Sequence, residues 1–283
     1  MNSNAQPVSE GAAQTARIAV EADRLGRRYG DVVAVESVSL SIAAGEFFAL
    51  LGPNGAGKTT TMHMLTTLVT PTSGNATVMG YDVVRDAAQV RRSLGMVFQD
   101  PALDDRLTAE ENLEIHAVLY GVPRRQVKGA IQAALEWASL ADAGKRRVRA
   151  FSGGMKRRLE LARALMHSPR VLFLDEPTIG LDPQGRRNLW EKIAQLRHAG
   201  MTVLMTTHNL PEAEACDRVG IIDHGKLVAV GTPTALIEEH ADRGAADLED
   251  VFIALTGNQL RDEAATARDR MVSFAKQGGE HTR

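Results

Sequence analysis

The sequence is poor in cysteine and in aromatic residues, and no apolar run in it is long enough to cross a bilayer. Cys216 is the single cysteine among 283 residues, so a disulfide framework is excluded and the chain fits a reducing compartment. The neighbours of Cys216, residues 213–215, predict a helix in which the thiol is buried and unreactive. A membrane-spanning helix needs about 20 consecutive apolar residues, and none is present. Residues 1–16 are polar and lack the apolar centre of a secretory signal, so we expect a disordered leader there.

An excess of one charge is also missing. Lys and Arg number 33 against 35 Asp and Glu, which gives a net charge of −2. Nucleic-acid-binding domains usually carry a strongly basic surface, so this balance predicts no nucleic-acid partner. The basic clusters Arg124–Arg125 and Lys145–Arg147 are predicted to be solvated faces. A chain of this length can bury a full core, either as one domain with a subdomain or as two small domains.

A glycine-rich loop is the most informative feature that the sequence does contain. Gly52–Thr59 fits the phosphate-binding pattern of Gly, four residues and Gly-Lys-Ser/Thr. The apolar run Phe47–Leu51 precedes it and a helical pattern follows, which is the strand–loop–helix context that the motif requires. Glycines let successive N–H groups turn toward phosphate oxygens, and the helix adds its positive end. Lys58 is predicted to reach the terminal phosphates of a nucleotide, and the Thr59 hydroxyl to ligate Mg²⁺.

A second nucleotide signal is an apolar strand that ends in two acids. Val171–Leu174 suits a parallel strand covered on both faces, and Asp175 and Glu176 follow it. Ligands of open α/β sheets bind at the carboxyl ends of strands. We therefore expect Asp175 to hold Mg²⁺ and Glu176 to orient and polarise an attacking water. Taken alone, the pair could equally be a helix-capping acid and a surface acid before Pro177.

The third motif, Phe151–Met155, lies shortly before this strand and opens a helix. Ser152 is a natural N-cap, and two glycines let a phosphate approach bare backbone N–H groups. Taken alone, the stretch could be an ordinary capped helix. It resembles the signature motif of ATP-binding-cassette (ABC) ATPases, and it departs from that motif at Met155, where the family usually has glutamine.

Four further residues match landmarks of the ABC family in the expected order. Tyr29 resembles the aromatic residue that stacks on adenine, and Gln99 the glutamine that touches Mg²⁺ and the membrane partner. Asp182 lies in a Gly-Leu-Asp stretch similar to the loop that crosses between two cassettes. His208 resembles the switch histidine that contacts the γ-phosphate. The resemblance covers about residues 17–240, most of the chain.

The resemblance implies ATP and Mg²⁺ as ligands and divides the matched residues by role. The catalytic set is Lys58, Glu176 and His208, and the metal-binding set is Thr59, Gln99 and Asp175. The nucleotide-binding set is Tyr29, Gly52, Pro53, Asn54, Gly55, Ala56, Gly57, Lys58, Thr59 and Thr60. The set that contacts the ATP of an opposite subunit is Ser152, Gly153, Gly154 and Met155, with Asp182 in the dimer loop.

The fold implied is an α/β P-loop NTPase of the ABC cassette type. It has an antiparallel β subdomain, a parallel-sheet α/β core and an inserted α-helical subdomain at about residues 100–168. The cassette spans residues 17–240, and residues 241–283 form a C-terminal extension whose charged part after Gly257 is predicted to be a loose helix or disordered.

Local patterns agree with this architecture. Period-two alternation over residues 34–42 predicts a strand, and a capping box at Thr108 predicts the start of a helix. Residues 223–226 predict a hairpin turn, and the helix after the phosphate loop is predicted to continue until Pro71.

The single phosphate loop and single signature have a mechanistic consequence. In ABC proteins the nucleotide lies between the phosphate loop of one cassette and the signature of another. The resemblance therefore implies a homodimer, or pairing with a second ABC cassette, around two ATP molecules. Because the chain has no membrane span, cargo would cross through a separate permease, and this subunit would lie in the cytoplasm at the inner face of the membrane.

Longer runs around the signature, around Gln99 and at Leu248–Phe252 resemble the daunorubicin-type drug-resistance branch of bacterial ABC exporters. They favour an ATPase that powers export of a drug, antibiotic or lipid-like substrate. One alternative is an importer ATPase, which shares the chemistry and differs in its permease. Another is a non-transport ABC protein, which usually carries two cassettes. A third alternative is a DNA-repair ATPase, but in that class a long coiled coil would separate the positions of Lys58 and Ser152.

Overall fold

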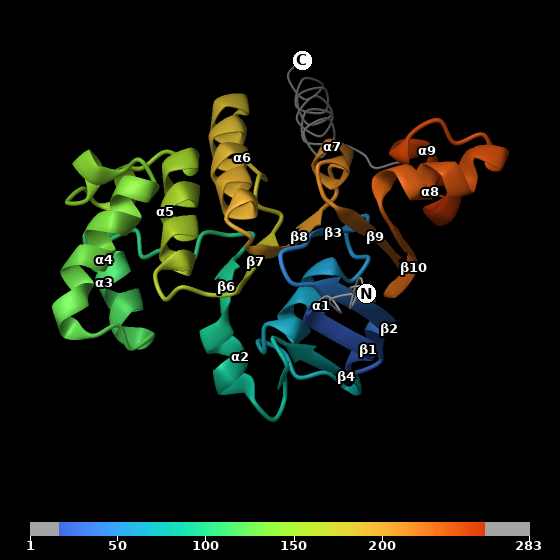
Figure 1. Ribbon diagram of the computed structural model, residues 1–283, viewed down its shortest axis with the longest axis horizontal. Coiled ribbons are helices and arrows are strands. Elements are labelled where there is room, and N and C mark those ends of the chain that lie inside the picture. Colours follow the sequence, from blue (N-terminus) through green and yellow to red (C-terminus); the bar gives the residue numbers. More distant parts are fainter. Residues whose placement is uncertain (1–16, 258–283) are drawn as a thin grey trace, which may run out of the picture.

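Antiparallel and parallel strands share one sheet in residues 17–257, the part of the chain that the computed structural model describes (Figure 1). The strands lie in the order β5-β4-β1-β2-β10-β9-β3-β8-β7-β6. Their bounds are Ile18–Tyr29 (β1), Val32–Ala43 (β2), Phe47–Leu51 (β3), Ser73–Val78 (β4), Tyr81–Asp82 (β5), Leu94–Val97 (β6), Val171–Asp175 (β7), Thr202–Thr207 (β8), Arg218–Asp223 (β9) and Lys226–Gly231 (β10). The helices are Lys58–Leu65 (α1), Ala87–Ser93 (α2), Ala109–Leu119 (α3), Arg124–Trp137 (α4), Gly153–Leu165 (α5), Pro183–His198 (α6), Leu210–Glu214 (α7), Pro233–His240 (α8) and Leu248–Thr256 (α9).

The antiparallel part consists of β5, β4, β1 and β2, with β1 paired to both β2 and β4. Its side chains alternate as the sequence predicts. Val38, Leu40 and Ile42 of β2 are buried, while the serines between them are exposed. Such alternation places one face of the antiparallel strands on the core and leaves the other to solvent.

The parallel part positions the candidate site. Strands β9, β3, β8, β7 and β6 are parallel neighbours, and every residue of β3, β7 and β8 is buried. These three strands end side by side, because Leu51 pairs with Thr207 and Asp175 pairs with Thr206. The phosphate loop, the two acids and His208 therefore leave the sheet at the same edge. The α/β core with an antiparallel part, expected from the sequence, is confirmed.

Helix α1 is shorter than expected, because it ends at Leu65 and not near Pro71. The Thr66 hydroxyl donates to the Met62 carbonyl, and Thr67 turns into the left-handed region with φ of 65°. The N–H of Leu68 then bonds to the carbonyl of His63 and closes the last turn. The left-handed turn at Thr67 thus ends the helix before the proline is reached.

A helical region follows β6, as predicted, and its first helix begins at Ala109, directly after the predicted capping residue. Thr108 caps this helix through the predicted capping box with Glu111. The preceding loop is held by Asn112, whose side chain accepts from the N–H of Asp104 and donates to its carbonyl. Helices α3, α4 and α5 then pack around a buried apolar cluster that includes Leu113, Leu135 and Leu159.

Three stacked rings join the helical region to the sheet. The rings of His116 and His167 each stack on Tyr120, and the Nε2 of His116 lies 3.4 Å from the Nδ1 of His167. The second ring nitrogen of His167 bonds to the carbonyl of Leu94 in β6. Burial, followed by the charge of Arg163 and the neighbouring His167, lowers the pKa of His116 to about 3. His116 is therefore neutral in the folded protein at physiological pH.

This histidine makes the fold sensitive to acid. Because the pKa of His116 is lower in the folded chain than the unfolded value near 6.5, only the unfolded chain takes up this proton as the pH falls below 6.5. The lost stability reaches about 2 kcal/mol near pH 5. We expect His116→Phe, which keeps an aromatic ring, to reduce the difference in unfolding free energy between about pH 7.5 and pH 5 by that amount. Urea unfolding at both pH values measures it.

The exposed His198 on α6 supplies the control, because His198→Gln removes a histidine without removing a buried one. If the His116→Phe variant loses as much stability on acidification as the wild type, acid sensitivity does not come from His116.

The C-terminal part of the described chain is a hairpin followed by two helices. Strands β9 and β10 are joined at His224 and Gly225, both with positive φ, so the predicted hairpin turn is confirmed. Cys216 is buried, its thiol donates to the carbonyl of Glu212, and burial raises its pKa. The prediction that Cys216 lies in a helix is wrong, because α7 ends at Glu214, before this residue.

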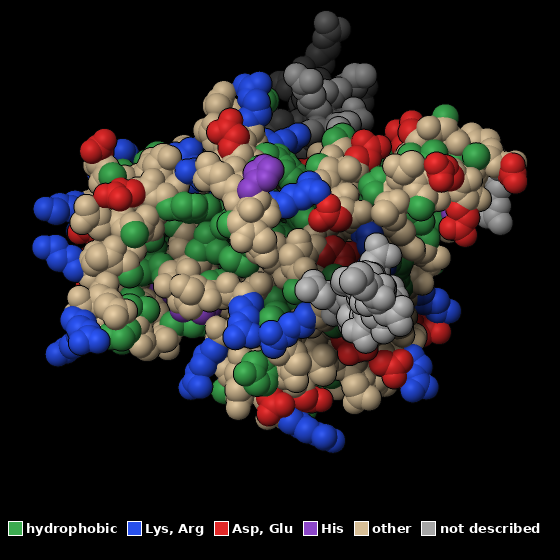
Figure 2. All heavy atoms as spheres, viewed as in Figure 1, with side chains coloured by type: hydrophobic (Ala, Val, Ile, Leu, Met, Phe, Trp, Pro, Cys, Tyr) green, Lys and Arg blue, Asp and Glu red, His purple; other side chains and the backbone are tan. Residues whose placement is uncertain are grey.

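Surface charge in the described part follows the sequence prediction. Arg124, Arg125 and Lys145–Arg147 are exposed, and Figure 2 shows Lys and Arg side chains projecting separately from the end of the molecule that holds α3 and α4. Between residues 17 and 257, no helix has both the length and the apolar character needed to cross a membrane. The predicted leader, residues 1–16, and the tail after Gly257 lie outside the described residues.

Candidate nucleotide site

The loop between β3 and α1 adopts a conformation that only glycine accepts at two of its positions. Gly55 and Gly57 have φ of 81° and 104°. A Cβ atom on Gly57 would lie 2.8 Å from the carbonyl oxygen of Ala34, and one on Gly52 would lie 2.4 Å from that of Ile222. The loop therefore packs closely against β2 and β9. It is followed directly by α1, which begins at Lys58.

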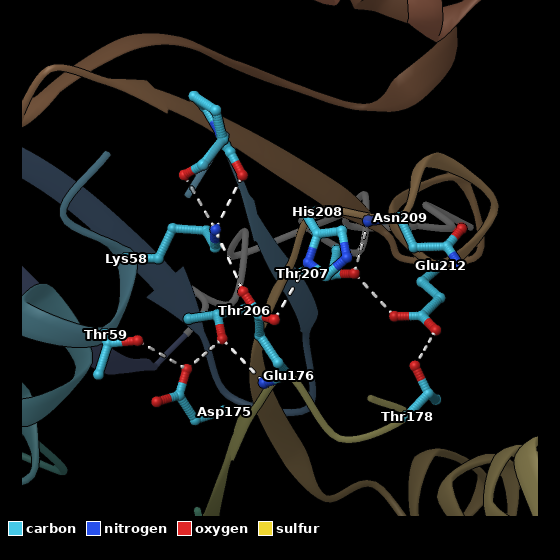
Figure 3. A network of polar contacts seen from close by, with 12 residues as sticks. Lys58, Thr59, Asp175, Glu176, Thr178, Thr206, Thr207, His208, Asn209 and Glu212 are labelled. Carbon is cyan, nitrogen blue, oxygen red and sulfur yellow. Dashed lines mark hydrogen bonds and ion pairs between the residues drawn. The ribbon is translucent and has the colours of Figure 1, made fainter. Parts of the chain in front are cut away.

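Lys58 is buried at the centre of this loop (Figure 3). Its ammonium group donates to the carbonyl of Gly52 at 2.8 Å and to that of Pro53 at 3.1 Å. It also lies 3.2 Å from the Oε1 of Glu176, and both side chains are more than nine-tenths buried. The loop thus holds a desolvated cation next to the carboxylate that the sequence assigned to catalysis.

Glu176 is held by contacts on both of its carboxylate oxygens. Oε1 faces Lys58, and Oε2 lies 3.0 Å from the Nδ1 of His208. Burial raises the pKa of Glu176, but the hydrogen bond with His208 and the charge of Lys58 outweigh it and hold the pKa below its usual value. The carboxylate therefore stays ionised at neutral pH and can accept a proton.

The backbone of Glu176 is strained. Its φ is 44°, in the left-handed region that costs an ordinary residue about 1–2 kcal/mol. The Glu176 N–H donates to both the hydroxyl and the carbonyl of Thr206 in the neighbouring strand β8. Strand β8 thus helps hold the conformation that points the carboxylate at Lys58 and His208.

Asp175 ends β7 beside Thr59. The Thr59 hydroxyl lies 3.3 Å from the Oδ1 of Asp175, which also accepts from the hydroxyl of Thr206. One hydroxyl and one carboxylate at a phosphate loop form the hard oxygen donor set that suits Mg²⁺, which is bound by few protein ligands and by substrate phosphates. The residues present therefore fit this metal.

A cavity of about 420 Å³ opens over the loop. It brings together residues that are distant in sequence, including the exposed Gln99 after β6. Its lining consists of Ala34, Asn54, Gly55, Gly57, Lys58, Thr59, Thr60, Gln99 and Glu176. Ala34 was not predicted from the sequence, because an alanine within a strand carries no chemical signal.

Tyr29 is not part of this lining. It ends β1, is 44% exposed, and stacks against the guanidinium of Arg27 at 4.5 Å. An exposed ring at the end of a strand is available for stacking, but the structure does not place it against the phosphate loop.

The signature residues also lie away from the cavity. Ser152 caps α5 and accepts from the N–H of Met155, as predicted, and Gly153 and Gly154 form the first turn. Helix α5 packs against α4, α6 and β6 (Figure 1). The side chain of Met155 packs on the apolar cluster of the helical region, which accounts for an apolar residue where the family usually has glutamine.

Asp182 has a local structural partner. It caps α6, and its Oδ1 accepts from the N–H of Gly185 at 2.8 Å. The loop between Glu176 and Asp182 is further held at Thr178, whose hydroxyl bonds to the buried carboxylate of Glu212 (Figure 3). Glu212 also accepts from the hydroxyl of Thr207, so one carboxylate joins this loop to the segment before His208.

Sequence reasoning missed four polar residues that support the site: Arg157, Glu160, Thr206 and Glu212. All four are buried. Arg157 and Glu160 lie three residues apart on the buried face of α5, and a charged pair on such a face is the signal that could have revealed them. Thr206 and Glu212 act through hydrogen bonds to residues on other elements, and their own sequence carries no such sign.

A phosphate loop, a buried lysine and two strand-end acids at one edge of a parallel sheet define a P-loop nucleotide-binding protein. A family model described as ABC transporter matches residues 35–179. The linearmycin resistance ATP-binding protein LnrL of Bacillus subtilis (strain 168) is 44% identical over 218 residues, covering 77% of this chain and 70% of that protein. The daunorubicin resistance ATP-binding protein DrrA3 of Streptomyces coeruleorubidus is 44% identical over 222 residues, covering 78% and 70%.

A solved structure agrees with these relatives. A dimeric ATP-binding cassette in a post-hydrolysis state, bound to ADP and Pi, matches with a TM-score of 0.68 and 26% identity over 75% of this chain and 98% of that one. The chain therefore belongs to the ABC transporter family, as an ATP-binding and ATP-hydrolysing subunit. The family resemblance given by the sequence is confirmed.

Proposed function

We propose that two copies of this chain, or one copy and a second ABC cassette, bind two ATP molecules between them and drive export through a separate membrane permease. One observation carries the proposal. The phosphate-loop cavity and the signature residues Ser152–Met155 lie on the same chain, but the signature contributes no residue to the cavity lining. Each site is then completed by the signature of the partner, whose glycine N–H groups at the start of α5 can meet a phosphate.

In this proposal the residues of the cavity, with His208 bonded to one of them, divide the hydrolytic reaction between them. The loop N–H groups and Lys58 bind the phosphates of ATP, and the charge of Lys58 stabilises the negative charge that develops on the γ-phosphate. A water attacks the γ-phosphorus, the bond to the ADP oxygen breaks, and Glu176 accepts the proton of the water. His208 holds the carboxylate through Nδ1 and presents its ring beside the γ-phosphate.

Mg²⁺ and the adenine are assigned to neighbouring residues. Thr59, Asp175 and Gln99 would hold Mg²⁺, which neutralises charge on the phosphates when bound. Tyr29 would stack on adenine. Asp182, which follows the loop held by Glu212, would face the second subunit.

The names of the relatives support one class of cargo. The two relatives above carry the names of linearmycin and daunorubicin resistance. We propose that the permease selects a drug, antibiotic or lipid-like substrate and that this subunit powers its export. The subunit would lie at the cytoplasmic face of the membrane, and helices α3–α5 would form its helical subdomain. The near-neutral balance of charge gives no support to a nucleic-acid partner.

Export can be tested by searching the neighbouring reading frames for a permease and co-expressing the chain with it in a drug-sensitive bacterium. We expect ATP-dependent expulsion of at least one compound from a panel of hydrophobic antibiotics that includes daunorubicin. Gln99→Ala should lower export about tenfold or more while part of the hydrolysis survives, because Gln99 lies between the cavity and the helical region and is one of three residues proposed to hold Mg²⁺. Efflux and phosphate release are measured on the same vesicles. Uptake in place of efflux would identify an importer.

A further inference from the structure

Arg157 is the most completely bonded polar side chain next to the site, although no motif assigns it a role. It lies in α5, five residues after Ser152, and is 3% exposed. A guanidinium has five N–H donors. Those of Arg157 reach five acceptors: the carbonyls of Phe98, Asp175, Glu176 and Pro177 and the carboxylate of Glu160.

Three of these acceptors are consecutive carbonyls at the end of β7. Nη2 donates to Asp175 at 3.3 Å and to Glu176 at 3.0 Å, and Nε donates to Pro177 at 2.6 Å. The middle residue of this run is the one with φ of 44°. Thr206 holds the N–H of Glu176 and Arg157 holds its carbonyl, so both backbone groups of the strained residue are fixed from neighbouring elements.

Side chains of α5 also bind the backbone of the segment that contains Gln99. Arg157 bonds to the carbonyl of Phe98, immediately before Gln99. Glu160 accepts from the N–H of Ala102 at 2.7 Å, and Arg163 donates to the carbonyl of Ala102. The segment from Phe98 to Ala102 is thereby bound at both ends to the helix that Ser152 begins.

We infer that Arg157 is a positioning residue that fixes the backbone of Glu176 relative to the signature helix and the Gln99 segment. A movement of α5 is transmitted through one guanidinium to the carbonyl of the general base. The inference rests on the catalytic role proposed for Glu176 above. Arg157 touches neither the cavity nor the phosphate loop, so it acts on the rate of hydrolysis and not on ATP binding.

The first test separates these two quantities in the full-length chain. Arg157→Lys keeps a cation but cannot serve five acceptors, and Arg157→Met keeps only the apolar stem. We expect both variants to lower kcat about 10- to 100-fold, because small misplacements of a reacting group have effects of that size. The dissociation constant for trinitrophenyl-ATP, measured by fluorescence, should change by less than about threefold, since Lys58 and its loop are untouched. An unchanged kcat in both variants would overturn the inference.

A second test separates positioning from stability. Arg157→Met removes the nearer of the two arginines that pair with the buried carboxylate of Glu160 and leaves Arg163 at 3.9 Å, which destabilises the fold by itself. The double variant Arg157→Met/Glu160→Leu removes the pair together and should regain much of the thermal stability without regaining kcat. Recovery of kcat together with the melting temperature would show that Arg157 is only a structural residue.

The third test asks whether Arg157 acts through Glu176. In single-turnover hydrolysis, adding Arg157→Met to a Glu176→Gln chain should lower the residual rate less than about twofold, because the group being positioned is already disabled. Losses that multiply would contradict the inference. A Glu176→Gln chain as active as the wild type would instead remove the catalytic role of Glu176, so the two failures are distinguishable.

Discussion

Lys58→Met is expected to lower ATP hydrolysis about 100- to 1000-fold, the loss that follows when one charged donor is removed from a desolvated site. Lys58 is 4% exposed and donates to the carbonyls of Gly52 and Pro53. Because its ammonium group is shielded from solvent, water cannot take its place when the charge is removed. Methionine fills the same apolar path but offers no donor. Release of inorganic phosphate at saturating Mg-ATP measures the effect, and fluorescence of trinitrophenyl-ATP reports the loss of binding.

The matched control is Lys226→Met, which removes a lysine from a surface ion pair with Glu36 in which both side chains are 56% exposed. Surface pairs of this kind contribute about 1 kcal/mol or less, so hydrolysis should stay near that of the wild type. If Lys58→Met hydrolyses ATP as fast as the control, the loop does not hold the terminal phosphates.

The Lys58→Met variant also tests whether each site is shared by two chains. Ser152→Arg should be inactive as well, because a long cation at the start of α5 fills the space meant for the partner's phosphate. Mixed dimers of the two variants contain one site with an intact Lys58 and an intact Ser152. Random pairing should therefore restore about a quarter of the wild-type activity, since half of the dimers are mixed and each has one working site. No recovery in the mixture would contradict the shared site.

Structural features that depend on residues adjacent in the sequence could be predicted. The phosphate loop, the strand before it and the helix after it lie within residues 47–65, where glycine spacing and apolar runs determine the local conformation. The N-cap roles of Thr108 and Ser152 were predicted because an N-cap hydrogen bond joins residues only three apart.

Features that depend on distant partners could not be predicted in the same way. Arg157 stands in a basic run, Lys156–Arg158, which by composition indicates a solvated helix face, yet its acceptors lie on other segments up to 59 residues away. The end of α1 was likewise set by local hydrogen bonds at Thr66 and Leu68 that no periodic pattern encodes. Remote parts of the chain were linked in advance only where motifs and landmarks match a known family order, as the phosphate loop, the strand-end acids, the signature and His208 do.

Glu176→Gln is expected to bind Mg-ATP and to hydrolyse it at less than about 1% of the wild-type rate, because an amide cannot accept the proton of the attacking water. Its effect on binding should be small or favourable. Glu176 and a γ-phosphate compete for the ammonium group of Lys58, which lies 3.2 Å from the carboxylate, and an amide competes less well. With hydrolysis stopped, the γ-phosphate continues to join two subunits, so the variant should accumulate as an ATP-bound dimer.

Size-exclusion chromatography at high protein concentration, with and without Mg-ATP, detects that dimer, and rapid-quench kinetics measure the residual hydrolysis. Glu212→Gln is the matched control, because Glu212 is a buried carboxylate of the same network that accepts only from the hydroxyls of Thr178 and Thr207. An amide can exchange hydrogen bonds with both hydroxyls, so this variant should keep most of its activity. If Glu176→Gln remains a monomer in Mg-ATP while binding the nucleotide, ATP does not hold two copies of this chain together. If it hydrolyses ATP as fast as Glu212→Gln, the proton of the water goes to another group.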